Sequence, residues 1–483
     1  MSGKLRTLAS DTLIYGLATI VGRFLTFLLT PLYTNFLPSK EEFGAVAYLY
    51  SILGFVNILY GFGADSAFLR FFSPDDERRS RMVFTMSFGI TATAGILGTM
   101  LCFAFASPVS EVLFARTDYA PLIRIASLMP FFDAVVIVPY AYLRMKRRAR
   151  RFALLKLAAI IVNVAANWFF LVKLHQGITG VVWAGTLASA IAATMIISEL
   201  LQNLRPHFDK KLFGEMLRFS LPTIPSSFSS MMLQVADRPI MMMLAGGAAV
   251  GMYQANYRLG IPMMLAVLVF EYAWKPFYLS HRNDADIGSL LSRALVYFSA
   301  VCGAIFLAGS LLIEFIVQIP FPGGKLINPA YWSGLGIVPI VLAGYYFNGV
   351  FTHLSAAFHI TKRTGYLPMA TAAAAAANIA LNFILIPVFG IAGGAWATFG
   401  AYLLSAITAK YYAKKIYPVR YDWKRVVLIA TITIILYIAG LWTHNLWLRL
   451  GVIAVYVPLL IVFGILSRQT FAAFATKFLR RKK

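Results

Sequence analysis

The sequence has 483 residues, of which 60% are hydrophobic and only 13% are charged, and its mean hydropathy is +0.74. Soluble domains contain roughly 45–50% apolar and about 25% charged residues, so this composition excludes a soluble cytoplasmic enzyme. The formal net charge is +24. Because the basic residues lie between hydrophobic windows, they indicate membrane topology and not a nucleic-acid partner.

Apolar windows long enough to cross a bilayer follow one another along almost the whole chain. Such a helix needs about 20 residues, and we therefore expect an all-α polytopic membrane protein with fourteen transmembrane helices. Charged residues, proline or glycine bound the windows, which are Thr12–Phe36, Phe43–Phe62, Val83–Ala106, Pro121–Leu143, Phe152–Val172, Ile178–Leu200, Met216–Ala236, Val250–Trp274, Ile287–Val317, Leu335–Phe358, Tyr366–Phe389, Ile391–Tyr412, Val426–Trp442 and Leu446–Leu466.

The distribution of lysine and arginine predicts the orientation. If the N-terminus is cytoplasmic, most of the 43 basic residues fall in inner loops and at inner helix ends. The outer side then carries only Lys40, Arg116, Arg124, Lys173, Arg238, Lys325 and Arg449. By the positive-inside rule, both termini are expected in the cytoplasm.

Residues typical of catalytic, disulfide or metal sites are scarce in the sequence. Cys102 and Cys302 both lie in apolar runs, and the six histidines are scattered, so neither a disulfide framework nor a metal site is expected. Phosphate-binding, metalloprotease and nucleophile-elbow motifs are missing from the sequence, and the loops are short. We expect no catalytic residues, no enzyme activity and no cofactor apart from a possible coupling H⁺ or Na⁺.

The fifth and sixth windows resemble the eleventh and twelfth. Asn163 and Asn167 match Asn378 and Asn382, and Arg147-Arg148 matches Lys362-Arg363 at the same offset. A second motif follows in both copies: Gly177-Ile178-x-Gly180-x-x-Trp183-Ala184 and Gly390-Ile391-x-Gly393-x-x-Trp396-Ala397. Near the start of each half, Phe43-Gly44 weakly echoes Val250-Gly251.

This internal repeat predicts two pseudo-symmetric six-helix lobes in the same membrane orientation, an arrangement typical of alternating-access transporters. We expect an N-lobe over residues 1–200, a cytoplasmic linker over 201–215 and a C-lobe over 216–413. Residues 414–483 then form two further helices and a basic cytoplasmic tail.

Two arginines are predicted inside the membrane. Arg23 lies about eleven residues into the first window, or about 16 Å at 1.5 Å per residue, and Arg258 lies within the eighth window. An arginine at the bilayer centre costs about 2.5–3.5 kcal/mol on insertion scales, so each should face a wet cavity or a partner. Guanidinium groups in a cavity suit a phosphate or pyrophosphate, and we predict both residues as substrate-binding.

Acidic residues leave alternatives open. Asp133 in the fourth window can bind a coupling ion, or it can neutralise Arg23, as can Asp65 near the inner end of the second window. Glu271, at the inner end of the eighth window, can close an inner salt bridge.

Pro222 and Pro225 interrupt the seventh window. Proline removes a backbone donor, and the neighbouring serines can satisfy the freed carbonyls. The segment is either a bending gate or a static kink.

Several short motifs resemble one family. They are Tyr15-Gly-Leu-Ala-Thr-Ile-Val-Gly22-Arg23-Phe, Pro31-Leu-Tyr-Thr-x-Phe36-Leu, Phe43-Gly44, Leu221-Pro222, Asp237-Arg238 with Gly251-x-Tyr253, Trp274-x-Pro276-Phe277 and the Gly-Ile-x-Gly-x-x-Trp-Ala pairs. The chain resembles the oligosaccharide-lipid flippases of the polysaccharide transport branch, within the multidrug/oligosaccharidyl-lipid/polysaccharide exporter superfamily. The likeness runs over essentially the whole chain.

This resemblance implies a V-shaped two-lobe fold in a bacterial cytoplasmic membrane. It implies that an undecaprenyl-pyrophosphate-linked oligosaccharide moves from the inner to the outer leaflet, for example for O-antigen, capsule or exopolysaccharide. Related lipid II flippases use cavity arginines for the pyrophosphate, and Arg23 best matches such a position. Other polysaccharide-assembly proteins, such as a polymerase, are possible partners. The alternatives are a cation-coupled multidrug antiporter that uses Asp133, and a membrane-embedded glycan polymerase or ligase.

Overall fold

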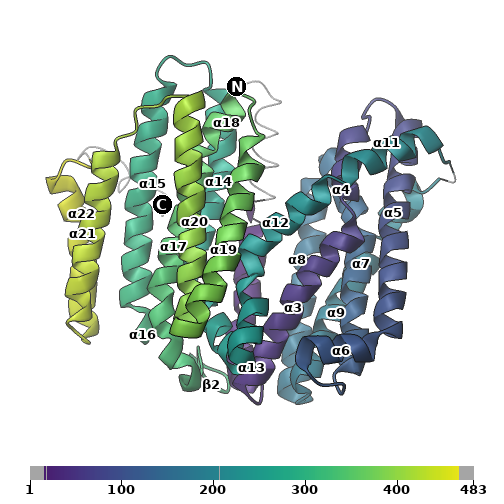
Figure 1. The fold of residues 1–483 in the computed structure, drawn as a ribbon, viewed down its shortest axis with the longest axis horizontal. Helices are drawn as coiled ribbons and strands as arrows, with labels where there is room; N and C mark the ends of the chain where they lie inside the picture. The colour runs from purple at the N-terminus through teal and green to yellow at the C-terminus, as the bar shows by residue number, and fades with distance from the viewer. Residues whose placement is uncertain (1–15, 18, 206, 467–483) are drawn as a thin grey trace, which may run out of the picture. The chain divides into compact units, whose positions relative to one another are not determined.

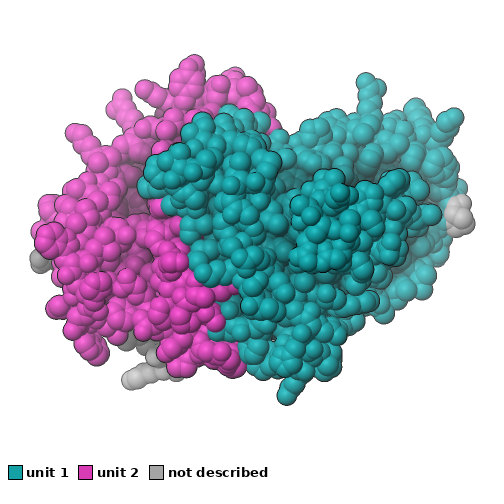
Figure 2. Space-filling view, turned by 60° about the horizontal axis from the view of Figure 1, so that its bottom comes forward, with its two compact units in different colours: residues 1–258, 371–397 teal, residues 259–370, 398–483 magenta. Residues whose placement is uncertain are grey.

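The computed structural model describes residues 16–17, 19–205 and 207–466, and nearly all of them are helical (Figure 1). Ten helices in this part of the chain are long and apolar enough to cross a membrane, so the protein is a multi-pass membrane protein. The chain divides into two compact units (Figure 2). Unit 1 contains residues 1–258 and 371–397, and unit 2 contains residues 259–370 and 398–483.

Unit 1 is built almost entirely from the first half of the chain. Its helices are α2 (Leu29–Phe36), α3 (Lys40–Gly61), α4 (Ala64–Phe71), α5 (Glu77–Ala104), α6 (Ala106–Phe114), α7 (Ala120–Met145), α8 (Ala149–Trp168), the π-helix η1 (Phe169–Lys173), α9 (Gly177–Met195), α10 (Ile197–Asn203), α11 (Lys210–Ser220), α12 (Thr223–Val235) and α13 (Asp237–Tyr257). Residues 371–397 add most of α19 (Tyr366–Phe389) and the start of α20 (Ile391–Ile416).

Unit 2 follows the 3-10 turn η2 (Arg258–Gly260). It contains α14 (Ile261–Ser280), α15 (Ile287–Leu311), α16 (Ile313–Ile316), η3 (Pro329–Ile337), α17 (Val338–Leu354), α18 (Ala356–Ile360), α21 (Trp423–Leu441) and α22 (Leu446–Val462). The short strands β1 (Pro320–Phe321) and β2 (Gly324–Lys325) form an antiparallel hairpin. The core of unit 2 includes Leu295, Leu307, Ile429 and Tyr456 from α15, α21 and α22.

Local signals explain where the helices of unit 1 begin. The Ser39 side chain accepts a hydrogen bond from the Glu42 backbone N–H at 3.2 Å and caps α3. Asp76 caps α5 in the same way through the Arg79 N–H, at 2.9 Å. These side chains satisfy N–H groups that have no partner within the helix.

The structure has ten helices long and apolar enough to cross a membrane in its described part, fewer than the fourteen windows predicted from the sequence. The other four windows do not each form one long helix there. The window Thr12–Phe36 lies partly outside the described residues. The window Met216–Ala236 is divided between α11 and α12 at Leu221–Pro222, and Val250–Trp274 is divided by η2. The last window contains α22, which has 17 residues.

The boundary between the seventh and eighth windows differs from the prediction. Residues 237–249, expected as an outer loop, are helical in α13 except for Gly246, whose φ of 79° and ψ of 176° turn the chain sharply. Glycine adopts this backbone without a Cβ penalty. A single residue therefore replaces the predicted loop, and Asp237 and Arg238 lie inside a helix.

The repeated motifs have the same local structure in both copies. Asn167 Nδ2 donates to Asn163 O at 2.8 Å, and Asn382 Nδ2 donates to Asn378 O at 2.8 Å. Arg147 and Lys362 both adopt left-handed backbone, with φ of 53° and 57°. Gly177 and Gly390 also match, with φ of 54° and 55°.

The two copies differ in length between their asparagines and glycines, because the first copy has two more residues there. The structure accommodates them in the π-helical turn η1 and in His175, which has a φ of 52°. A π-helical turn absorbs an inserted residue without ending the helix. The two copies therefore keep the same backbone conformation on both sides of the two-residue insertion.

α3 and α13 cross with their backbones in contact. A Cβ atom added to Gly44 would lie 1.8 Å from the Gly247 carbonyl oxygen, and one added to Gly251 would lie 2.1 Å from the Lys40 oxygen. Small residues four apart, as in Gly247 and Gly251, allow such close packing inside a membrane. The two segments that weakly echo each other in sequence therefore pack against each other.

Gly44→Ala tests this crossing. The added methyl cannot fit without moving α13, and we expect a destabilisation of about 1–3 kcal/mol. Thermal unfolding of the purified protein, followed by size-exclusion chromatography, measures the loss. Gly288→Ala is the control, since a Cβ at Gly288 meets nothing within 4 Å. Equal melting temperatures for the two variants would contradict the contact.

Candidate functional site

Arg258 lies where the chain passes from α13 into α14, and its guanidinium points to the first helices of unit 1. Its Nη1 donates to the Thr30 hydroxyl at 3.2 Å. The guanidinium lies 6.0 Å from the centre of the Tyr33 ring, and Tyr50 and Arg238 are within electrostatic range. Among the described residues, no carboxylate lies within ion-pair distance of Arg258. No carboxylate of the described residues therefore neutralises its charge.

Arg23 belongs to a second group of cations. Residues 19–27 are helical, and the Arg23 side chain is exposed. Its neighbour Gly22 packs against α8, where an added Cβ would lie 2.8 Å from Ile160 Cδ1. Lys156, one turn earlier on α8, interacts electrostatically with Arg23 and Arg144. The first helix, the end of α7 and α8 therefore bring three positive charges within electrostatic range of one another.

Lys156 was not singled out from the sequence, in which it lies near the inner end of the fifth window and counts there with the inner basic residues. The structure begins α8 at Ala149, so Lys156 lies two turns inside a membrane-spanning helix. Its ammonium lies 5.6 Å from the centre of the Phe152 ring, one turn before it. A lysine surrounded by Leu, Ala and Ile was the signal that could have identified it.

Asp133 is not paired with Arg23 or with any other cation among the described residues. Instead its two carboxylate oxygens accept hydrogen bonds from Ser189 at 2.8 Å and Asn57 at 3.4 Å. Asn57 Oδ1 is buried and has no hydrogen-bond partner in the described part of the chain. Asp133 thus forms, with α3 and α9, a small polar centre inside unit 1.

The other acidic candidates lie apart from the arginines. Asp65 is in α4 and accepts a hydrogen bond from Ser66 at 3.4 Å. Glu271 is exposed on α14, and its electrostatic partner is Lys275, one turn later on the same helix. Within the described residues, no group of three His, Cys, Asp or Glu could hold a metal ion.

Pro222 and Pro225 lie at an interruption between α11 and α12. Pro222 precedes the first residue of α12, and Pro225 is in its first turn. Thr223 Oγ1 donates to Ser220 O at 2.7 Å, and Ser229 Oγ donates to Pro225 O at 3.0 Å. Hydroxyl groups thus satisfy carbonyls around the break, and a gating role for the prolines stays a prediction.

Arg238 was placed among the outer basic residues, and in the structure it forms a buried ion pair with Asp237 in α13. Arg238 Nη1 lies 2.7 Å from Asp237 Oδ1, and Arg238 Nε donates to Gln254 Oε1 at 3.0 Å. The guanidinium also lies 4.7 Å from the centre of the Tyr257 ring. Gln254 and Tyr257 follow the turn at Gly246, whereas Arg238 precedes it. This network therefore joins the two arms of α13, the helical segments before and after Gly246.

The sequence matches one known family. Residues 8–278, more than half of the chain, match the family described as "Polysaccharide biosynthesis protein". No curated protein matches the sequence significantly.

Solved membrane transporters have the same fold. The lipid II flippase MurJ in an inward closed conformation matches with a TM-score of 0.78 and 18% identity, over 93% of this chain and 98% of the flippase. An inward-facing multidrug resistance MATE family transporter of the MOP superfamily matches with a TM-score of 0.65 and 15% identity. The match covers 81% of this chain and 94% of that transporter.

A MOP superfamily transporter from Pyrococcus furiosus, described as having a binding pocket of reverse polarity, is similar as well. Its TM-score is 0.58 at 13% identity, and the match covers 84% of this chain and 95% of that transporter. At these identities the likeness is one of fold. Together with the family match, it confirms the resemblance inferred from the short motifs.

Arg238→Met tests the buried network. Removing the guanidinium leaves the Asp237 carboxylate buried and unpaired, which typically costs about 3–5 kcal/mol. The double variant Asp237→Asn/Arg238→Met removes both charges and should recover part of this loss. Thermal unfolding of both variants measures the difference. Arg116→Met, in an exposed ion pair with Asp118, should leave the melting temperature unchanged. A double variant less stable than Arg238→Met would contradict this account.

Proposed function

Because the chain belongs to the polysaccharide biosynthesis protein family, we propose that it is an alternating-access flippase for a lipid-linked oligosaccharide. The substrate is an undecaprenyl-pyrophosphate-linked repeat unit that moves from the inner to the outer leaflet of the bacterial cytoplasmic membrane. Fourteen helices with both termini in the cytoplasm complete the proposed topology. The chain itself catalyses no covalent reaction, and partners such as a polymerase act on the product.

The observation that carries this proposal is the un-neutralised positive charge inside unit 1. A guanidinium within a membrane normally lies beside a carboxylate or backbone acceptors, because its burial is costly. Arg258 has the Thr30 hydroxyl, tyrosine rings and the cation Arg238 near it, and no carboxylate of the described part of the chain pairs with it. Arg23 and Lys156 form a second cationic group. A pyrophosphate offers the charge and the multiple acceptors that such groups bind.

The direction of transport agrees with the electrical driving force. Moving a negative charge outward across an inside-negative membrane releases about 2.3 kcal/mol per charge for each 100 mV crossed. Export of an anionic pyrophosphate is therefore possible without a nucleotide.

The polar centre at Asp133 favours an additional role in ion coupling. A carboxylate held by Ser189 and Asn57, with no cation beside it in the described residues, can bind H⁺ or Na⁺. This centre also keeps a second function open, a cation-coupled multidrug antiporter, for which the similarity in fold to MATE family transporters is further support. A glycan polymerase or ligase has no comparable support.

Arg258→Gln and Arg23→Gln test the flippase. Each variant loses charge-assisted hydrogen bonds to pyrophosphate worth about 1.5–3 kcal/mol, so we expect transport to slow by about tenfold or more. The measurement is uptake of an undecaprenyl-pyrophosphate-linked oligosaccharide by proteoliposomes under an imposed potential.

Arg116→Gln, on an exposed loop, serves as the matched control and should transport normally. Monodispersity and melting temperature establish folding. Unchanged transport in both membrane variants would remove the arginines from the substrate site. Failure of the wild-type protein to move this lipid would favour the antiporter.

Asp133→Asn tests ion coupling. The amide keeps hydrogen-bonding capacity but cannot bind a coupling cation through a negative charge. We expect potential-driven flipping to continue and its acceleration by an imposed H⁺ or Na⁺ gradient to disappear. Asp65→Asn is the control, because Asp65 lies in a different helix with only Ser66 as its hydrogen-bond partner in the described residues. A gradient response that survives in Asp133→Asn would exclude this role.

A further inference from the structure

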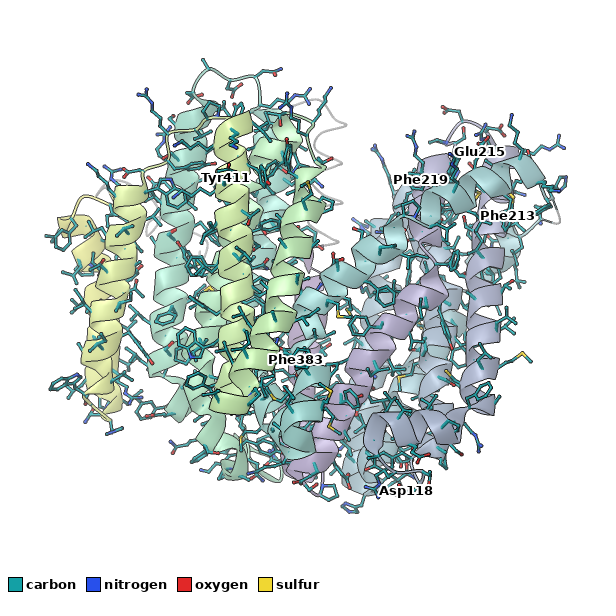
Figure 3. All side chains as sticks on the ribbon, in the orientation of Figure 1. Asp118, Phe213, Glu215, Phe219, Phe383 and Tyr411 are labelled. Carbon is teal, nitrogen blue, oxygen red and sulfur yellow. The ribbon has the colours of Figure 1, made fainter. Side chains whose placement is uncertain are left out.

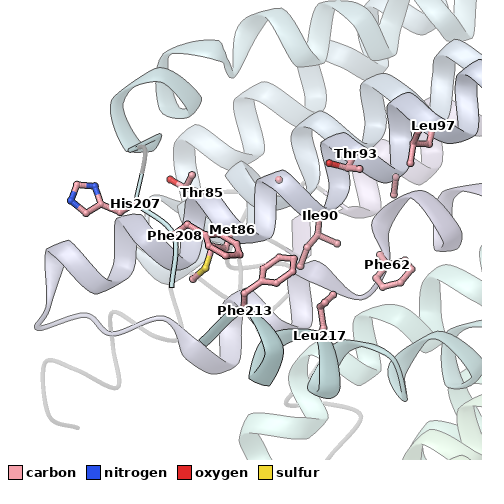
Figure 4. Close-up of a pocket in the computed structure, with 12 residues that line it drawn as sticks. Phe62, Thr85, Met86, Ile90, Thr93, Leu97, His207, Phe208, Phe213 and Leu217 are labelled. Carbon is pink, nitrogen blue, oxygen red and sulfur yellow. The ribbon is translucent and has the colours of Figure 1, made fainter. Parts of the chain in front are cut away.

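Unit 1 contains an apolar groove between α5 and α11, with a volume of about 740 Å³. Residues of α5 spaced by one helical turn form one wall, and the apolar face of α11 forms the other. Figure 4 shows Met86 and Ile90 opposite Phe213 and Leu217. The remaining lining residues are Phe62, Thr85, Gly89, Thr93, Ala94, Leu97, His207 and Phe208.

The groove is long and open along one side. From Thr85 to Leu97 it follows about twelve residues of α5, or about 18 Å at 1.5 Å per residue. Half of a hydrocarbon core of about 30 Å is about 15 Å, so this length matches one leaflet. Gly89 is exposed in the wall, and a Cβ there would meet nothing within 4 Å. Leu97 and the neighbouring Met100 and Leu101 are also exposed, so the open side continues into an apolar surface that suits lipid.

The end of the groove at Thr85 is bonded to the backbone of two basic residues, Arg81 and Arg205. The Thr85 hydroxyl donates to Arg81 O and accepts from the Arg205 N–H, both at 2.9 Å. Arg81 pairs through Nη2 with Glu77, yet its Nε is buried and has no hydrogen-bond partner in the described residues. His207 lies at the same end. Three basic residues, Arg81, Arg205 and His207, therefore lie at this end of the groove.

α11 is amphipathic, which explains why it forms this wall. Leu212 and Met216 are buried in the cluster around Phe68 and Phe84, whereas Lys211, Glu215 and Arg218 are exposed. Figure 3 shows Phe213 and Glu215 on different sides of the helix. A helix with one apolar and one charged face lies naturally at a membrane interface.

We propose that this groove binds an anionic membrane phospholipid. One acyl chain lies between α5 and α11, and the phosphate accepts hydrogen bonds at the Arg81 and Arg205 end. The apolar walls exclude a sugar or a free anion, and the cationic mouth favours a negative headgroup over a zwitterionic one. The bound lipid would hold α11 against α5, next to the interruption at Pro222.

The test is native mass spectrometry of the full-length protein titrated with palmitoyl-oleoyl phosphatidylglycerol, with the phosphatidylcholine analogue in parallel. Gly89→Leu fills the groove from α5, and we expect it to lose one tightly bound phosphatidylglycerol. Thr93→Leu is a second filling variant at the same wall. Gly214→Leu is the matched control on the exposed side of α11, where a Cβ also meets nothing within 4 Å, and it should bind as the wild type does.

Arg81→Gln tests the headgroup contact separately. Loss of hydrogen bonds to a charged phosphate should weaken phosphatidylglycerol binding about tenfold and reduce the preference for phosphatidylglycerol over phosphatidylcholine. Monodispersity and melting temperature check that each variant folds.

Three results would overturn the proposal. In the first, folded Gly89→Leu and Thr93→Leu bind as many phosphatidylglycerol molecules as the wild type. In the second, both lipids bind equally well. In the third, undecaprenyl phosphate displaces phosphatidylglycerol at lower concentration, which would assign the groove to the carrier lipid.

Discussion

The contact between the backbones of α3 and α13 is the constraint on which the arrangement of unit 1 depends. Three glycines allow it: Gly44 on α3, and Gly247 and Gly251 on α13. Because α13 is held directly on α3, its end at Arg258 reaches Thr30. The turn at Gly246 folds the first arm of α13 back on the second, and the Arg238–Gln254 bond joins the arms. The position of the Arg258 guanidinium thus depends on close packing of residues that carry no charge.

Charges within the helices fall into two kinds. Some are neutralised by immediate neighbours. Arg238 lies beside Asp237, and in unit 2 Arg449 contacts Glu314 at 2.8 Å and the Leu311 oxygen at 2.7 Å. Arg258 and Asp133 are different, since the described residues supply only neutral hydrogen-bonding partners to them. Structural ion pairs and candidate ligand-binding charges are therefore separable by their partners, although both are rare in a membrane.

Much of the fold could be predicted from sequence because bilayer thickness imposes a helix length. The window Tyr366–Phe389 coincides with α19, and the duplicated asparagines form the same hydrogen bonds in both copies. The turn at Gly246 could not be predicted, since a one-residue connection leaves no polar loop and Arg238 before it was counted among the outer basic residues. Lys156 was hidden by its closeness to a basic run. The partners of Arg258 and Asp133 required the packing of helices far apart in the chain.

Arg147 and Lys362 both combine a left-handed backbone with a basic side chain. Glycine would adopt this backbone with less strain than any residue with a Cβ atom. Arginine and lysine instead keep a positive charge at corresponding points of both repeats. The duplicated framework therefore accepts local conformational strain and keeps a basic side chain at the corresponding turn of both repeats. At these two turns the repeat is kept in charge as well as in backbone conformation, which a comparison based on glycine patterns would overlook.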